Sequence, residues 1–125
     1  MKVLALDFGS ARTGVAVSDP TGTLARPVGV IQAVGSEPGL AKLVELIQEE
    51  RPERIVVGMP LTLRGAHGEQ ARATEEFVES LRTRVDVPVE TFDERFTSVL
   101  ADGDDAKAAA HLLSSYLEWS STPRR

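Results

Sequence analysis

The chain has 125 residues, the length of one domain, and hydrophobic residues make up 42% of it, which is enough for a core. Its net charge of −5 argues against a nonspecific basic nucleic-acid binder, although a few placed arginines can serve an enzyme that acts on nucleic acid. The chain has no cysteine, which excludes a thiolate metal site and a disulfide framework.

The N-terminal segment gives no sign of export or of a membrane anchor. Met1 and Lys2 lead directly into an apolar strand pattern, without the features of a signal peptide. No apolar run approaches the roughly 20 residues that span a bilayer. We therefore expect a cytoplasmic protein.

The first 19 residues predict two neighbouring strands with a carboxylate at the end of the first. Short apolar runs cover residues 2–8 and 14–18, a pattern typical of strands that are buried on both faces. The link between them is short enough only for a hairpin, so the two strands should be antiparallel. Asp7 then ends a core strand, where an unpaired charge would cost several kcal/mol. We expect a cation, a metal or a ring of hydrogen-bond donors beside it.

A third strand and a first helix follow. A turn signal at residues 19–22 precedes a strand predicted over residues 28–34, which completes a three-strand meander. Ser36 is a suitable helix N-cap, and proline is tolerated in the first turn. The helix should end at residues 51–52, and its apolar side chains recur at the spacing of one helical face: Leu40, Leu43, Val44 and Ile47.

The second half of the chain alternates strands and helices. A buried strand at 55–58 should run parallel to the first strand after the helical crossover. A helix then resumes through residue 84, and a fifth strand is predicted over 87–92, with Pro88 at its start. The last helix begins near residue 104 and carries a stripe of small and apolar residues: Ala106, Ala109, Ala110, Leu113 and Leu117. The order βββαβαβα indicates an α/β fold with a mixed five-stranded sheet and helices on its faces.

Three acids stand out by their position along this fold. Asp7 ends the first strand, Glu94 follows the fifth, and Asp105 opens the last helix. Strand ends that leave the same edge of a sheet can bring acids together, and clustered carboxylates are usually neutralised by a hard divalent cation. Two such ions can activate water against a phosphodiester. With 19 acids in the chain, spacing alone does not distinguish these three from chance.

Four motifs, in order and over nearly the whole chain, resemble those of the YqgF family, also called RuvX. They read LALDFGSARTGVAVSD, VVGMPLTLRG, DERFTS and DDAKAAAHLLSSYLE. Members of that family resemble Holliday-junction resolvases of the ribonuclease H-like fold. They are regarded as nucleases implicated in maturing the 5′ end of precursor 16S ribosomal RNA. The resemblance implies one ribonuclease H-like nuclease domain over residues 1–119, followed by a polar tail at 120–125.

The resemblance also implies roles for individual residues. The active-site acids, which would hold one or two Mg²⁺ or Mn²⁺ ions, fall on Asp7, Glu94 and Asp105. Substrate contacts fall on Arg12, Arg95, Thr97 and Ser98. The implied enzyme is a metal-dependent hydrolase of phosphodiester bonds in ribosome biogenesis, acting on structured RNA or branched DNA as a monomer or homodimer.

One departure from the family pattern concerns the third acid. Family members usually carry a longer helical and loop segment between the DERxT(S/T) motif and the last helix. Here only residues 99–104 separate Ser98 from Asp105. The length of this link therefore bears on whether Asp105 reaches the other two acids.

Structural explanations stand beside these roles. Asp7 could be a hydrogen-bond acceptor at a turn, Glu94 could simply pair with an arginine, and Asp105 could be an acid favoured by the helix dipole. Asp93 is the rival of Glu94 as a ligand, and Arg12 and Arg95 could be ordinary surface charges. The remaining noted residues are expected to be structural: His67 and His111 as fillers, Gly58 and Gly65 as turn formers, and Tyr116 and Trp119 as packing residues.

Two other functional classes compete with the nuclease. The segment Asp7-Phe8-Gly9-Ser10 also resembles the first phosphate loop of actin-like ATPases and sugar kinases, but that fold needs two such domains and this chain supplies one. A Holliday-junction resolvase in DNA recombination is the nearer alternative. A non-catalytic RNA-binding factor of ribosome maturation is the third, and it predicts RNA binding that is indifferent to metal and to Asp7.

Overall fold

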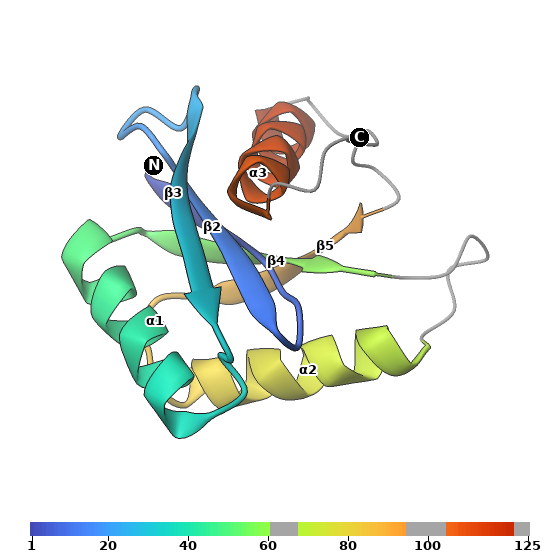
Figure 1. The fold of residues 1–125 in the computed structure, drawn as a ribbon. Helices are drawn as coiled ribbons and strands as arrows, with labels where there is room; N and C mark the ends of the chain where they lie inside the picture. The colour runs from blue at the N-terminus through green and yellow to red at the C-terminus, as the bar shows by residue number, and fades with distance from the viewer. Residues whose placement is uncertain (61–67, 95–104, 122–125) are drawn as a thin grey trace.

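The computed structural model describes residues 1–60, 68–94 and 105–121 (Figure 1). The elements within these residues follow the predicted order βββαβαβα. They are β1 (Val3–Asp7), β2 (Arg12–Ser18), β3 (Ala25–Gln32), α1 (Glu37–Glu50), β4 (Arg54–Met59), α2 (Glu69–Arg82), β5 (Val89–Asp93) and α3 (Asp105–Ser121).

The strands form one mixed sheet with the order β3-β2-β1-β4-β5. The pairs β1–β2 and β2–β3 are antiparallel, whereas β1–β4 and β4–β5 are parallel, so the predicted meander and the two added parallel strands are confirmed. Helix α3 covers one face of the sheet, and α1 and α2 lie on the other (Figure 1). The carboxyl ends of β1, β4 and β5 therefore leave the same edge of the sheet.

Alternation along the strands divides the core into two layers. Leu4 and Leu6 of β1 pack with residues of α1 and α2, whereas Val3 and Ala5 pack beneath α3. Successive side chains of a strand point to opposite faces, so Asp7, two residues after Ala5, belongs to the face that α3 covers. The first strand thus delivers a carboxylate to the rim of the α3 layer.

Helix α1 begins and ends as its sequence predicts. The Ser36 hydroxyl accepts a hydrogen bond from the Gly39 amide at 3.3 Å, which satisfies one free amide of the first turn. At the other end Arg51 adopts a left-handed conformation with φ 52°, and its amide donates to the Ile47 carbonyl. Pro52 follows and prevents the helix from continuing.

Strand β3 begins earlier than predicted. It starts at Ala25 rather than at residue 28, and it ends at Gln32, after which Ala33 turns with φ 53°. Pro27 is tolerated inside β3 because this is an edge strand, and the register with β2 shifts beside it, between Val15 and Ala16. Val34 is buried in the core although it lies beyond the strand.

The interior face of α3 is broader than the predicted stripe. Ala109, Leu113 and Leu117 are buried as expected, and Leu112 and Tyr116 are buried beside them. Tyr116 packs edge-on against Phe92 at a ring separation of 5.6 Å, which confirms its expected packing role. No helix in the described part of the chain is long and apolar enough to cross a bilayer.

Candidate active site

Asp7 and Glu94 meet at the shared carboxyl edge of the parallel strands. Asp7 is the last residue of β1, and Glu94 follows the last residue of β5, with β4 lying between these strands. Both side chains are partly buried, and their carboxyl groups are hydrogen-bonded to each other. They open into a pocket of about 200 Å³ whose other lining residues come from the turn after β1, the end of β4 and the start of α2: Phe8, Gly9, Ser10, Pro60, Gln70, Ala73 and Thr74.

The two carboxyls hold a proton between them. Burial raises the pKa of Glu94 to about 7, and the neighbouring Asp7 charge adds to the rise. Burial also raises the pKa of Asp7, as does the charge of Asp105, while the hydrogen bond from Glu94 opposes the shift. Two carboxylates this close cannot both ionise cheaply, so Glu94 is the carboxyl that keeps a proton below about pH 7.

Phe8 fixes the end of β1 against α2. Its ring stacks on Phe77 with centroids 4.6 Å apart and planes 18° apart. The next residues are tied locally, because the Thr13 hydroxyl donates to the Gly9 carbonyl at 3.4 Å. The segment that follows Asp7 is therefore held on both sides, and the carboxylate is held with it.

Asp105 lies at the first position of α3 and is paired with Arg12. Its Oδ2 is 3.0 Å from Nε of Arg12, whose side chain is 61% exposed at the start of β2. The Asp105 charge is close enough to raise the pKa of Asp7, but its carboxylate is engaged by the guanidinium. Across residues 1–60, 68–94 and 105–121, no three His, Cys, Asp or Glu side chains are grouped so that they could hold a metal ion.

The donor chemistry of the Asp7–Glu94 pair nevertheless fits a hard divalent cation. Such ions take carboxylate oxygens, and a cation bound between two carboxyls replaces the proton that they otherwise share. Asp7 and Glu94 are thus the two described acids whose carboxyls lie together, whereas the carboxylate of Asp105 is engaged by Arg12.

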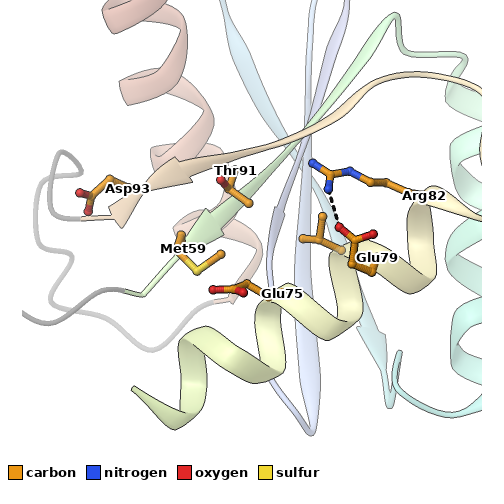
Figure 2. A pocket seen from close by; sticks show the side chains of 7 residues that line it. Met59, Glu75, Glu79, Arg82, Thr91 and Asp93 are labelled. Carbon is orange, nitrogen blue, oxygen red and sulfur yellow. Dashed lines mark hydrogen bonds and ion pairs between the residues drawn. The ribbon is translucent and has the colours of Figure 1, made fainter. Parts of the chain in front are cut away.

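Asp93, the rival of Glu94, faces a different pocket. That pocket has a volume of about 600 Å³ and is lined by Met59, Glu75, Val78, Glu79, Arg82, Thr91 and Asp93 (Figure 2). Its arginine is already occupied, because Nη1 of Arg82 lies 2.7 Å from Glu79 and Nη2 donates to the Val89 carbonyl at 2.7 Å. The pocket is therefore rich in carboxylates and ill suited to a phosphate.

The remaining predicted residues divide into described and undescribed ones. Arg95, Thr97 and Ser98 lie outside the described residues, as do His67 and Gly65. Gly58 was expected to form a turn, which is wrong: it lies within β4, since the strand continues to Met59. Trp119 packs against Phe92 at 5.5 Å, and His111 is partly buried with an Nε2 that has no hydrogen-bond partner among the described residues.

Sequence reasoning missed two glycines that border this site. A side chain at Gly58 would meet Glu94, and one at Gly14 would meet the backbone of Asp105. The only signal in the sequence was a glycine inside an apolar strand pattern, which indicates close approach of another part of the chain.

Comparisons with known proteins find relatives that match most of the chain. A family model described as "RuvX: Holliday junction resolvase" matches residues 1–119. A protein of Chloroflexus aurantiacus named "Putative pre-16S rRNA nuclease" is 46% identical over 100 residues, covering 80% of this chain and 65% of that protein. A protein of the same name from Sulfurihydrogenibium is 40% identical over 132 residues, covering 94% and 90%. The matched part of this chain thus spans about two thirds of the Chloroflexus protein.

A solved structure shares the fold. The Thermus thermophilus RuvC in complex with a Holliday junction substrate superimposes with a TM-score of 0.63 at 16% identity, covering 96% of this chain and 95% of that one. At this identity the likeness concerns the fold, which is thereby the ribonuclease H-like fold predicted from the sequence.

Proposed function

The chain belongs to the RuvX family, and we propose that it is a metal-dependent nuclease that hydrolyses phosphodiester bonds in structured nucleic acid. The observation that carries the proposal is the Asp7–Glu94 pair, two partly buried carboxyls that are hydrogen-bonded to each other at the carboxyl edge of parallel strands. Burying two carboxyls beside each other costs folding free energy, and carboxyls whose pKa values are perturbed in this way are typical of functional sites. The name of the relatives favours precursor 16S ribosomal RNA as the substrate, and the family resemblance implies that it is cut at its 5′ end.

We assign the residues their roles as follows. Asp7 and Glu94 would hold one or two Mg²⁺ or Mn²⁺ ions through their carboxylate oxygens, with Asp105 as the third ligand. A bound ion of this kind supplies Lewis acidity and lowers the pKa of a water molecule that it binds. Arg12 neutralises a substrate phosphate near the acids. Arg95, Thr97 and Ser98 remain the further substrate contacts that the family motif implies.

The wider setting is part of the same proposal. Residues 1–119 would act as a single nuclease domain followed by a polar tail, in the cytoplasm, where ribosomes are assembled. The protein would work as a monomer or as a homodimer; a four-way junction has two-fold symmetry and would favour the dimer.

The test compares cleavage by wild type and by Asp7→Asn. End-labelled RNA spanning the 5′ end of the precursor, and a four-way DNA junction, are incubated with Mn²⁺, Mg²⁺ or EDTA. We expect metal-dependent cuts in the RNA that disappear in Asp7→Asn, because the amide cannot replace a negatively charged ligand. Asp86→Asn, on an exposed residue between α2 and β5, is the matched control and should cut like wild type. Cuts retained by Asp7→Asn would overturn the proposal.

A second candidate function is RNA binding without catalysis. The observation that favours it is the Arg12–Asp105 ion pair, which leaves the third acid engaged by an arginine instead of a cation. In the cleavage experiment this function predicts no cuts. When RNA affinity is measured on the same proteins, it should be equal with Mn²⁺ and with EDTA, and equal in wild type and Asp7→Asn. Preferential cutting of the DNA junction would instead indicate a resolvase.

A further inference from the structure

Asp7 lies between two glycines in the sheet. The antiparallel register pairs Asp7 with Gly14 of β2. On the other side the parallel register pairs Leu6 with Val57, so the next residue along each strand places Gly58 beside Asp7. All three residues belong to the face beneath α3, because Ala5, Ala16 and Val56, two residues before or after them, pack in that layer.

Gly58 leaves the space through which Glu94 reaches Asp7. A Cβ at Gly58 would lie 2.6 Å from Oε1 and 3.0 Å from Cγ of Glu94, and 3.1 Å from a methyl group of Leu112. Real Cβ atoms essentially never come within 3.0 Å of such neighbours. Since β4 separates β1 from β5, any side chain at this position would stand between the two carboxyls.

Gly14 likewise leaves the space that the backbone of Asp105 occupies. A Cβ at Gly14 would lie 1.9 Å from the carbonyl oxygen of Asp105, 2.6 Å from its carbonyl carbon and 3.3 Å from the amide nitrogen of Ala106. These are backbone atoms of the first turn of α3, so the clash could be relieved only by moving the helix start. The first turn of α3 therefore rests directly on β2.

Backbone conformation does not explain either glycine. Among the described residues only Gly22 is a glycine with a positive φ, of 73°, so Gly14 and Gly58 adopt conformations open to other residues. Gly29 in β3 shows the contrast, because a Cβ there would meet nothing within 4 Å. What Gly14 and Gly58 supply is the absence of a side chain.

We propose that Gly14 and Gly58 are positioning residues that set the places of two of the three acids around Asp7. Gly58 admits the Glu94 side chain to the Asp7 carboxyl, and Gly14 admits the α3 backbone that carries Asp105. The inference rests on the proposed function for its meaning, since it concerns the ligand geometry of that site. What the inference adds is that the site depends on glycine at the two sheet positions beside Asp7.

The two glycines predict different failures. At Gly58 the nearest atoms belong to the side chains of Glu94 and Leu112, so Gly58→Ala should fold and displace the Glu94 carboxyl. At Gly14 the nearest atoms are backbone, so Gly14→Ala should shift the first turn of α3 together with Asp105 and its contact with Arg12. Gly29→Ala is the matched control, a glycine-to-alanine change in a neighbouring strand with no atom in its way.

The experiment determines crystal structures of the wild type and the three variants and measures Mn²⁺ affinity by electron paramagnetic resonance. We expect a displaced Glu94 carboxyl in Gly58→Ala, a displaced Asp105 in Gly14→Ala, and Mn²⁺ binding about 10- to 100-fold weaker in both, the usual cost of disturbing groups that orient metal ligands. Gly29→Ala should match wild type in structure and affinity. Should Gly14→Ala fail to fold, Gly58→Ala alone decides the question.

Two results would overturn the inference. One is a Gly58→Ala structure in which Glu94 still contacts Asp7 unchanged, and the other is wild-type Mn²⁺ affinity in a variant whose acid has moved. A wild type that binds no Mn²⁺ would count against the proposed function instead. The crystal structures would then still show whether the glycines determine where the acids lie.

Discussion

The Nε atom of Arg12 lies 3.0 Å from Oδ2 of Asp105, so the start of β2 is joined to the start of α3 by an ion pair beside the Asp7–Glu94 pair. Both members are accessible, with side-chain exposures of 61% and 31%. An exposed pair of this kind adds little to stability. Its interest is that a phosphate could compete for Arg12 and a cation for Asp105.

Replacing Arg12 should therefore have opposite effects on two ligands. In Arg12→Ala we expect weaker RNA binding, with the slope of log affinity against log salt reduced by about 0.7 to 1, the effect of one lost phosphate contact. We expect tighter Mn²⁺ binding without RNA, because the competing cation is gone from Asp105. RNA affinity is measured by adding Arg12→Ala to the Asp7→Asn variant, in which the RNA should not be cut. Mn²⁺ affinity is measured by titrating wild type and the Arg12→Ala single variant.

The control for Arg12 is Arg26→Ala, another exposed arginine, which lies in β3 and approaches Glu50 only at 3.9 Å. It should leave Mn²⁺ affinity unchanged. Arg12→Lys, which keeps the charge, should restore most of the RNA affinity. Unchanged Mn²⁺ and RNA affinities in Arg12→Ala would show that its pairing with Asp105 is an ordinary surface contact.

The shared proton predicts how stability depends on pH. The pKa of Glu94 is raised to about 7, above the ordinary value that applies in the unfolded chain. A group whose folded pKa is raised stabilises the fold fully below its unfolded pKa and loses that contribution as the pH rises through the folded value. In EDTA, urea unfolding of wild type should therefore show stability falling between about pH 5 and 8.

Glu94→Gln isolates this effect, because its amide cannot ionise. Its free energy of unfolding should vary less with pH over the same range, so the difference from wild type should widen between about pH 5 and 7 and level off above about pH 8. Mn²⁺ affinity of the wild type should rise with pH over this range, since the proton must leave before the cation binds. Parallel pH profiles for the two proteins would contradict the shared proton.

Some of this site could be predicted from sequence and some could not. Asp7 was recognisable because a short apolar run ends in a charge, and Glu94 because the family motif marks it. That Asp93 and Glu94 line different pockets could be seen only in the structure, since sequence does not tell to which face each of two adjacent acids points. Gly58 was misassigned because a glycine that ends an apolar run usually marks a turn, and the residue that fills its space is 36 positions away in the chain.

The same limit applies to α3. Its stripe of small and apolar residues marked Ala109, Leu113 and Leu117, which are buried, but the pattern did not show that Leu112 and Tyr116 share the buried face. Nor could spacing show that Arg12 would meet Asp105, because residues 93 positions apart were joined only by the fold. Local patterns predict elements, whereas contacts between distant residues follow from how the elements pack.

Tyr116 should contribute to stability without affecting the site. Its ring is 2% exposed, its hydroxyl donates to Glu90, and it accepts a hydrogen bond from Nη1 of Arg54 at 2.9 Å, so it ties α3 to β4 and β5. Tyr116→Phe leaves these charged partners without the hydroxyl and should cost about 1–2 kcal/mol of unfolding free energy. Urea unfolding measures the loss, and Ser120→Ala, at the exposed end of α3, should show none.

Cleavage by Tyr116→Phe should stay at the wild-type rate under conditions in which the variant is folded. The Tyr116 hydrogen bonds to Glu90 and Arg54 lie about three turns of helix from Asp105. The first turn of α3 is held separately by its contact with β2. A large loss of cleavage in a fully folded variant would mean that the Tyr116 hydrogen bonds also determine the position of the acids.

Asp19 should make the protein sensitive to acid through the turn between β2 and β3. Its Oδ1 accepts hydrogen bonds from the amides of Thr23 and Leu24, both at 2.8 Å, and its Oδ2 accepts from the Thr21 hydroxyl. The Thr21 hydroxyl and these amides hold the pKa of Asp19 well below its usual range. A lowered folded pKa stabilises the protein above the unfolded value and loses that contribution as the pH falls.

The prediction for Asp19 is tested by unfolding wild type, Asp19→Asn and Asp86→Asn in urea from pH 7 down to pH 3. Asp19→Asn should be less stable than wild type at pH 7, and the gap should narrow as the pH falls below about 4, where the unfolded aspartate takes up its proton. Asp86→Asn should follow the wild-type curve. Asp19 lies in the turn between β2 and β3, far from the sheet edge that carries Asp7 and Glu94, so Asp19→Asn should lower stability and leave Mn²⁺ affinity intact. A stability difference from wild type that is the same at every pH would mean that the charge of Asp19 does not contribute.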